Sequence, residues 1–210
     1  KMQRVFRNAM DKLLADGEEF ERLAGNYDGA RGNARFIDGL ATLLRSRCGW
    51  EVGPQNIAIT NGSQSSFYVL FHLFAGEFNQ GKKRKILLPL APEYIGYADV
   101  GMGADLFHTY RPTIELRGDR EFKYHVDFAH LDVSDEIGAI AVSRPTNPTG
   151  NVLTDTEIAG LRELAIRHGI PFILDSAYGG PFPSIVFPET KNVWDSNTIL
   201  CLSLSKLGLP

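Results

Sequence analysis

A lysine near the end of the sequence, Lys206, follows an apolar run and has apolar neighbours. A lysine that is desolvated in such a place loses basicity and becomes a good nucleophile for forming a Schiff base. Asp175 ends an earlier apolar run. A carboxylate there needs a cationic partner, because an isolated buried charge is energetically unfavourable. That partner is either a basic side chain of the protein or a protonated ring nitrogen of a ligand.

A glycine turn at residues 61–64 leads directly into an apolar helix. The N–H groups at the start of that helix either hold a phosphate or are simply capped by Ser63. The turn matches neither the GxxxxGK[ST] pattern of phosphate-binding loops nor the GxGxxG pattern of dinucleotide-binding folds. A nicotinamide-dependent oxidoreductase is therefore not indicated.

Four further side chains come after predicted strands. Asn147 either caps its own turn or reaches a ligand, Tyr178 either packs a loop or donates a hydrogen bond, and Ser203 either caps a helix or binds an anion. Tyr94 adds an aromatic ring. A phosphate turn, a carboxylate, an aromatic ring and a lysine are together what pyridoxal phosphate (PLP) requires.

The elements that must position these groups follow from the apolar pattern. Short apolar strands alternate with amphipathic helices, which indicates a mainly parallel sheet covered on both faces. Ligands of such sheets bind beyond the carboxyl ends of the strands, where the polar residues should therefore converge. Helices are predicted before residue 17, between residues 36 and 49, through residues 67–74 and over residues 155–168. Strands are predicted at 57–60, 85–90, 104–110, 137–143, 171–174 and 198–202, with a polar excursion over 111–124.

Three motifs in the second half of the chain, taken together, resemble the class I aminotransferases, which are fold-type I PLP enzymes. The motifs are Asn147-Pro148-Thr149-Gly150, Asp175-Ser176-Ala177-Tyr178 and Ser203-Leu204-Ser205-Lys206. The resemblance covers essentially the whole chain. It implies an α/β fold, namely the three-layer α/β/α large domain of this family with its mostly parallel sheet.

The resemblance also implies a domain organisation. Residues 1–26 would be an N-terminal helix and connection that belong to the small domain or to an interface, and residues 27–210 would be the PLP-binding large domain. On this comparison we expect the large domain to be incomplete at its C-terminus. The small-domain arginine that binds the substrate carboxylate would lie outside the chain, so the 210 residues alone are expected to bind the cofactor weakly and to be weakly active or inactive.

Each residue that matches the family's motifs takes a role from the resemblance. Lys206 would bind the cofactor covalently and then move the proton between the substrate α-carbon and the cofactor. Asp175 would keep the pyridine nitrogen protonated, and Tyr94 would stack on the ring. Tyr178 and Asn147 would donate hydrogen bonds to the phenolate oxygen of the cofactor.

The remaining matches concern the phosphate of the cofactor. Gly62, Ser63 and Gln64 would hold it together with Ser203. Tyr27 resembles the tyrosine that reaches the phosphate in the neighbouring subunit, which implies a homodimer.

The activity implied is transamination between L-valine, or a similar small aliphatic amino acid, and pyruvate. It would give 3-methyl-2-oxobutanoate and L-alanine by ping-pong chemistry through pyridoxamine phosphate. Two alternatives stay open. One is another fold-type I PLP activity, such as a different aminotransferase specificity or a C–S lyase. The other is an aminotransferase-like ligand-sensing domain of a transcription regulator.

Composition narrows the possible partners and location of the protein. Lys and Arg number 22 against 25 Asp and Glu, and this net charge of −3 argues against a nucleic-acid partner. The sequence contains neither a long apolar run nor a leader pattern, so we expect no membrane partner. The two cysteines suit a reducing compartment, and we expect a cytoplasmic protein. The five histidines lack metal-ligand spacing, so we expect no metal.

Overall fold

The structure is a computed structural model that describes residues 2–103, 105–181 and 189–205. The described residues fall into two compact units. The first unit contains residues 2–60, 181 and 203–205, and the second contains residues 61–180 and 189–202 except residue 104. The domain boundary expected after residue 26 stays a prediction. Lys206 lies outside the described residues.

The first unit is helical, with α1 (Met2–Ala15), α2 (Gly17–Gly25), α3 (Ala34–Cys48) and a short 3-10 helix, η1 (Pro54–Asn56). The side chain of Asp16 caps α2 by accepting a hydrogen bond from the N–H of Glu19, with an N···O distance of 3.2 Å. Gly49, with φ of 68°, ends α3 in the left-handed conformation that glycine adopts readily. Part of the expected N-terminal connection is therefore the helix α2.

The strand predicted at residues 57–60 is wrong. The backbone of Ile57 is extended, but residues 57–60 join no sheet. Instead the N–H of Ile59 donates a single backbone hydrogen bond of 2.7 Å to the carbonyl of Arg31. An apolar run predicts extended backbone, but only a neighbouring strand makes it part of a sheet.

The second unit contains the main sheet, whose strands lie in the order β1-β2-β6-β7-β8, with β3 also paired to β2. All its pairings are parallel except that of β1 with β2. The strands are β1 (Gly76–Glu77), β2 (Lys83–Leu88), β3 (Phe107–Thr109), β6 (Ile137–Ser143), β7 (Phe172–Asp175) and β8 (Thr198–Cys201). The mostly parallel α/β sheet is confirmed.

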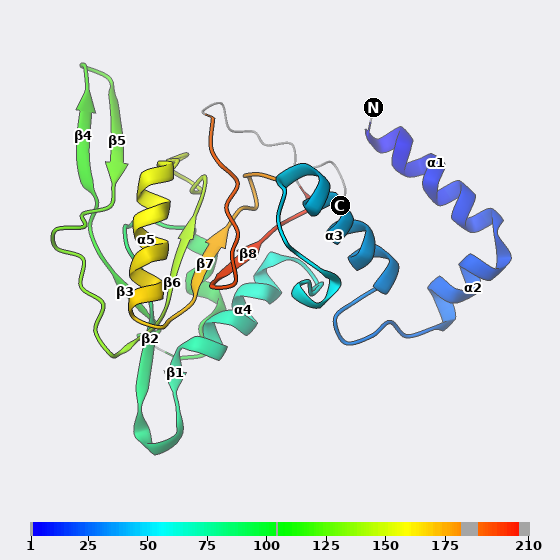
Figure 1. Cartoon of the computed structure of the whole chain (residues 1–210), viewed down its shortest axis with the longest axis horizontal. Coiled ribbons are helices and arrows are strands. Elements are labelled where there is room, and N and C mark those ends of the chain that lie inside the picture. The colour runs from blue at the N-terminus through cyan, green and yellow to red at the C-terminus, as the bar shows by residue number, and fades with distance from the viewer. Residues whose placement is uncertain (1, 104, 182–188, 206–210) are drawn as a thin grey trace. The chain divides into compact units, whose positions relative to one another are not determined.

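Alternate residues of the strands face two separate cores, one on each face of the sheet whose strands Figure 1 shows. Leu87, Ile140 and Phe172 pack with apolar residues of α5 (Asp155–Arg167) on one face. On the other face, Ile86 and its neighbours pack against the two buried phenylalanines of α4 (Ser63–Phe74), Phe67 and Phe71. This period of two places a helix on each face and confirms the three-layer arrangement.

The polar excursion expected at residues 111–124 is mostly a β-hairpin. It consists of β4 (Thr113–Arg117) and β5 (Glu121–His125), which pair antiparallel around a turn at Gly118. All five residues of β4 are exposed. Short exposed strands carry no continuous apolar signal, which is why the sequence pattern missed them.

Two short 3-10 helices, η2 (Asn79–Gly81) and η3 (Ile95–Val100), complete the second unit. β6 passes so close to the end of α4 that a Cβ added to Gly138 would lie 1.7 Å from the carbonyl oxygen of Phe74. Only glycine fits there. None of the described helices is sufficiently long and apolar to cross a bilayer.

Candidate functional site

Asp175 is the last residue of β7 and is buried at the carboxyl edge of the sheet. Its Oδ2 accepts a hydrogen bond of 2.9 Å from the hydroxyl of Tyr97, and its Oδ1 accepts one of 2.9 Å from the N–H of Ala177. Burial raises the pKa of this carboxyl, while the two hydrogen bonds favour the ionised form. No lysine or arginine among the described residues forms an ion pair with Asp175.

The segment that contains Tyr97 connects Asp175 to two residues expected in the cofactor site. The Tyr97 ring meets that of Tyr94 edge to face, with ring centroids 5.4 Å apart. The side-chain amide of Gln64 donates a hydrogen bond of 3.3 Å to the carbonyl of Gly96 in the same segment. The structure therefore brings Gln64, Tyr94 and Asp175 together. Burial raises the pKa of Tyr97, and the nearby charge of Asp175 raises it further, so the phenol stays a proton donor.

A second carboxylate, Glu93, is buried in the same network. Its Oε1 accepts a hydrogen bond of 3.0 Å from the N–H of Ser143, and its Oε2 accepts one from the Ser143 hydroxyl. Ser143 ends β6 and stands in register with Asp175 on β7. Burial raises the pKa of Glu93 to about 7, and the nearby charge of Asp175 acts in the same direction.

The sequence pattern missed both Glu93 and Tyr97 as members of this site. Tyr94 was expected to stack on the ring, but a loop pattern does not say which of its neighbours point inward. One signal was available: Tyr94 and Tyr97 are three residues apart, a spacing that brings side chains together on a helical turn.

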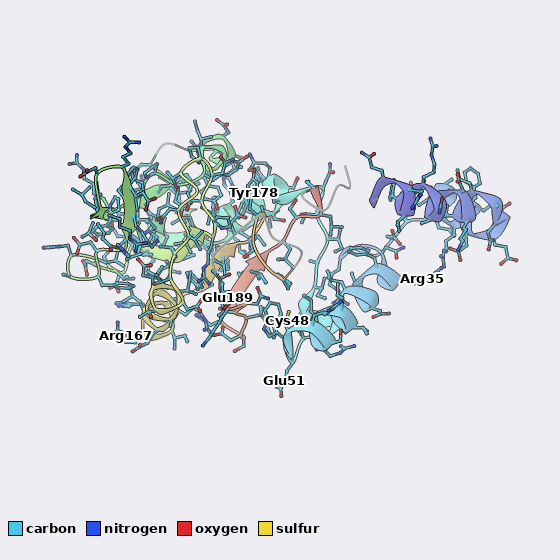
Figure 2. The ribbon with its side chains drawn as sticks, turned by 90° about the horizontal axis from the view of Figure 1, so that it is seen from above. Arg35, Cys48, Glu51, Arg167, Tyr178 and Glu189 are labelled. Atoms are coloured by element: carbon cyan, nitrogen blue, oxygen red, sulfur yellow. The ribbon has the colours of Figure 1, made fainter. Side chains whose placement is uncertain are left out.

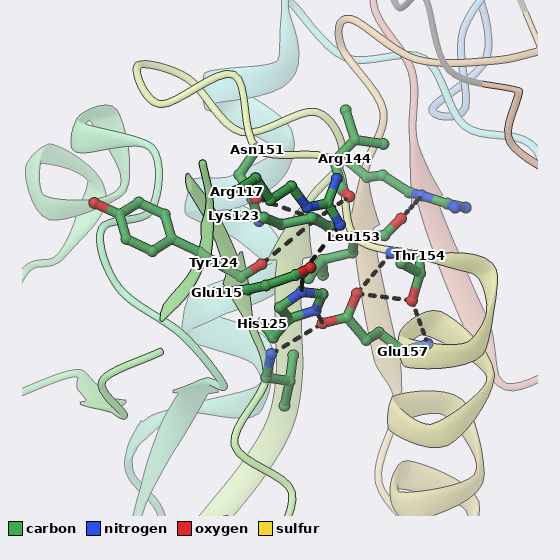
Figure 3. Close-up of polar contacts among 12 residues, drawn as sticks. Glu115, Arg117, Lys123, Tyr124, His125, Arg144, Asn151, Leu153, Thr154 and Glu157 are labelled. Carbon is green, nitrogen blue, oxygen red and sulfur yellow. Dashed lines mark hydrogen bonds and ion pairs between the residues drawn. The ribbon is translucent and has the colours of Figure 1, made fainter. Parts of the chain in front are cut away.

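The loop that follows β6 carries Asn147. Two cationic side chains, Arg144 and Lys123, hold this loop by hydrogen bonds (Figure 3). Arg144 Nε donates to the carbonyl of Leu153 at 2.7 Å, and Arg144 Nη2 pairs with Asp155 Oδ1 at 2.6 Å. Lys123, on β5, donates to the carbonyl of Val152 at 2.7 Å. Arg144 therefore has a structural role in this loop.

Lys123 also donates a hydrogen bond of 3.2 Å to Asn151 Oδ1, so one ammonium holds two adjacent residues of the loop. Partial burial lowers the pKa of Lys123. An open cavity of about 690 Å³ lies around this side chain, lined also by Arg117 and Arg144. None of the residues expected to bind PLP lines that cavity. The cavity therefore lies outside the candidate site, and Lys123 contributes by supporting the loop.

We expect Lys123→Met to loosen the loop. The substitution keeps the apolar stem but leaves the carbonyl of Val152 and the Asn151 amide without their donor. The free energy of unfolding should fall by about 1.5–3 kcal/mol, the usual effect of losing hydrogen bonds to a charged group. Amide hydrogen exchange over residues 146–152 should become faster. Lys83→Met removes an exposed ion pair with Glu77 and serves as the control, with little expected effect. Equal effects of the two substitutions would contradict the assigned role.

α4 begins with the turn that was expected to hold a phosphate. Its N-cap is Gly62, with φ of 82°, and Ser63 is the first helical residue. Ser63 therefore does not cap the helix, contrary to the ordinary interpretation of this turn. A glycine at the N-cap supplies no side-chain oxygen to the N–H groups of the first turn, and the helix dipole favours an anion there.

The other expected ligands lie in several places. Asn147 is half-buried in the loop after β6, and Tyr178 is half-buried in the turn after β7 (Figure 2). Ser203 belongs to the first unit, where its hydroxyl is 3.2 Å from that of Ser205 and accepts from the Ser205 N–H. Tyr27 is fully exposed in the same unit.

The described residues fit an aromatic cation with a phosphate tail. Asp175 offers an ionisable carboxylate, Tyr94 offers a ring, and the start of α4 offers backbone donors to an anion. In the described part of the chain, no three His, Cys, Asp or Glu side chains come together as metal ligands would. The site is thus built from an acid, aromatic rings and hydrogen-bond donors.

Comparison with known proteins places this chain in a family. The chain is 54% identical over 210 residues to a valine–pyruvate aminotransferase of Escherichia coli, covering 100% of this chain and 50% of the relative. The crystal structure of a valine–pyruvate aminotransferase from Salmonella typhimurium superimposes with a TM-score of 0.87 at 53% identity, covering 100% of this chain and 51% of that one.

A putative amino-acid aminotransferase from Psychrobacter arcticum superimposes with a TM-score of 0.83 at 49% identity, covering 89% of this chain and 45% of that one. The chain therefore spans about half the length of the relatives that it matches. The family model "Aminotransferase class I and II" matches residues 3–209. The chain belongs to the class I and II aminotransferase family.

Proposed function

We propose that this protein is a PLP-dependent aminotransferase that moves an amino group between L-valine, or a similar small aliphatic amino acid, and pyruvate. The observation that carries the proposal is the buried carboxylate of Asp175, which has no basic partner among the described side chains. A buried carboxylate is stabilised when a cation meets it. The protonated ring nitrogen of PLP is such a cation.

Bound PLP supplies a ring that withdraws electrons and so stabilises negative charge at the substrate α-carbon. The residues of the chain would bind and orient it. Asp175 would hold the proton on the ring nitrogen, and Tyr97 would keep the carboxylate in place. Tyr94 would cover one ring face, while Asn147 and Tyr178 would donate hydrogen bonds to the phenolate oxygen.

At the phosphate, the N–H groups at Gly62, Ser63 and Gln64 would act together with the Ser203 hydroxyl. Lys206 would attach the cofactor and then transfer the proton at the substrate α-carbon. This role rests on the family motif, since Lys206 lies outside the described residues.

The substrate assignment rests on the two relatives named as valine–pyruvate aminotransferases, at 54% and 53% identity. We further propose a homodimer in which Tyr27 reaches the cofactor phosphate of the partner. The complete exposure of the Tyr27 side chain supports this role. A cytoplasmic location stays a prediction.

The experiment is a titration of the protein, expressed from its natural gene, with PLP. We expect a new absorption band from cofactor bound to a lysine, distinct from the band of free PLP. Borohydride reduction should make that bond permanent, and mass spectrometry of a digest should place the added mass on the peptide containing Lys206. Valine and pyruvate should then yield alanine.

Each outcome bears on a different part of the proposal. Absence of the band, or a label on another lysine, would overturn the cofactor site. A correct label with no alanine from valine and pyruvate would leave the PLP site standing and overturn the substrate assignment. Screening other amino donors against pyruvate would then distinguish another aminotransferase specificity from a C–S lyase.

A further inference from the structure

Glu93 ties together two segments that carry expected PLP ligands. The first segment contains Tyr94, whose N–H donates a hydrogen bond of 3.2 Å to Glu93 Oε2. The second is the end of β6, where Ser143 donates to both oxygens of the carboxylate. Asn147 lies four residues beyond Ser143. One buried side chain thus connects the ring-stacking tyrosine to the loop that carries the asparagine.

The way in which Glu93 is bound requires a carboxylate. Oε1 accepts from the Ser143 N–H, and Oε2 accepts from the Tyr94 N–H and the Ser143 hydroxyl. An amide of the same shape has one acceptor oxygen and one donor nitrogen. Either orientation of such an amide points an NH₂ group at a backbone N–H. Glutamine would therefore leave one of the two backbone N–H groups, that of Tyr94 or that of Ser143, without its acceptor.

Glu93 also lies within electrostatic range of Asp175, because each stands at the carboxyl edge of the sheet beside Ser143. Among the described residues, the groups that donate hydrogen bonds to Glu93 are all uncharged: two backbone N–H groups and one hydroxyl. The titratable groups that act on it or on its neighbours in this cluster are Asp175, Tyr97 and Cys201. Burial raises the pKa of both Tyr97 and Cys201, so these two groups stay neutral. The negative charge of the cluster therefore comes from the carboxyls of Glu93 and Asp175, on the side of the sheet where Asp175 would meet the ring.

We propose that Glu93 is a positioning residue of the cofactor site: its buried carboxylate fixes Tyr94 and the Asn147 loop relative to Asp175, and its charge reinforces that of Asp175. This inference rests on the proposed PLP function. Glu93 acts through Tyr94, Ser143 and Asp175 and makes no contact with the cofactor itself.

The test is Glu93→Gln in the protein expressed from its natural gene. We expect the dissociation constant for PLP to increase about fivefold to tenfold, since one backbone hydrogen bond in the site is lost. The pH midpoint of the bound-cofactor absorption band should fall by about 0.5 to 1 unit, because removing a negative charge disfavours protonation nearby. Without cofactor, the amides of residues 94 and 143 should exchange hydrogen faster.

The chain offers a matched control in Glu157. This buried glutamate accepts hydrogen bonds from the N–H of Val126 on Oε1 and from the N–H and hydroxyl of Thr154 on Oε2. The backbone and hydroxyl donors match those of Glu93, with one added contact of 3.1 Å between His125 Nδ1 and Glu157 Oε1, and Glu157 belongs to the start of α5 (Figure 3). Glu157→Gln should disturb stability without moving the PLP dissociation constant or the midpoint of the band.

A second variant, Glu93→Asp, keeps the charge but draws the carboxylate back by one methylene group. It should weaken PLP binding while moving the midpoint less than Glu93→Gln does. An unchanged band and dissociation constant in a folded Glu93→Gln protein, or equal changes in Glu157→Gln, would overturn the inference alone. Absence of a band in the unmodified protein would overturn the proposed function and this inference together.

Discussion

Replacing Asp175 with asparagine is expected to reduce transamination by about 10²- to 10³-fold, a loss typical of removing one group that stabilises a transition state electrostatically. The amide has nearly the shape of the carboxylate but cannot hold a proton on the ring nitrogen. Steady-state kinetics with valine and pyruvate would measure the loss. Weaker binding of PLP, measured by absorption titration, should accompany it.

The same substitution should affect the cofactor-free protein in the opposite direction. Burial raises the pKa of Asp175, so its ionised form is unfavourable in the folded protein when no cation is present. Asp175→Asn should therefore raise the free energy of unfolding of the cofactor-free protein at neutral pH. Such a gain in stability with a loss of function is typical of residues kept for a ligand.

Tyr97→Phe is the companion variant. It removes the 2.9 Å hydrogen bond to Asp175 but leaves the charge, so activity should fall only about tenfold. If Asp175→Asn lost no more activity than Tyr97→Phe, the carboxylate would not be the partner of the ring nitrogen. Far-UV circular dichroism would verify that both variants remain folded.

The parallel sheet could be predicted because its strands are buried on both faces. Residues 137–143 form a continuous apolar run, and β6 occupies that same range. The hairpin of β4 and β5 could not be predicted in this way, because its side chains are largely exposed and its pairing is local. α2 was missed for a related reason: it buries none of its residues and is stabilised by the Asp16 cap and by acidic residues in its first turn.

The candidate site divides in the same way. Asp175 and Tyr94 could be found because parallel strands deliver the residues that follow them to one edge. Glu93 and Tyr97 could not be found from the sequence, because their role in the site depends on which side chains of the loop after β2 point inward. That choice depends on contacts with β6 and β7, which are distant in sequence. Motif spacing therefore finds the groups that meet the ligand more readily than the groups that hold them.

Glu93→Gln is also expected to change how stability depends on pH. The pKa of Glu93 is about 7 in the folded protein against an ordinary value of 4.5, so the folded state binds the proton more tightly than the unfolded state. This contribution to stability is fully present below pH 4.5 and is lost as the pH rises through 7. Its size is about 3 kcal/mol, since each unit of pKa difference corresponds to about 1.4 kcal/mol.

Glutamine carries no titrating proton, so the variant lacks this dependence. Urea unfolding of both cofactor-free proteins between pH 4.5 and pH 8 would give the difference in free energy of unfolding at each pH. That difference should shift by about 3 kcal/mol in favour of Glu93→Gln as the pH rises. The lost backbone hydrogen bond adds a constant penalty to the variant, so it does not affect the slope. A difference that stayed flat with pH would mean that Glu93 titrates normally, and that its carboxylate is not held in the buried network described above.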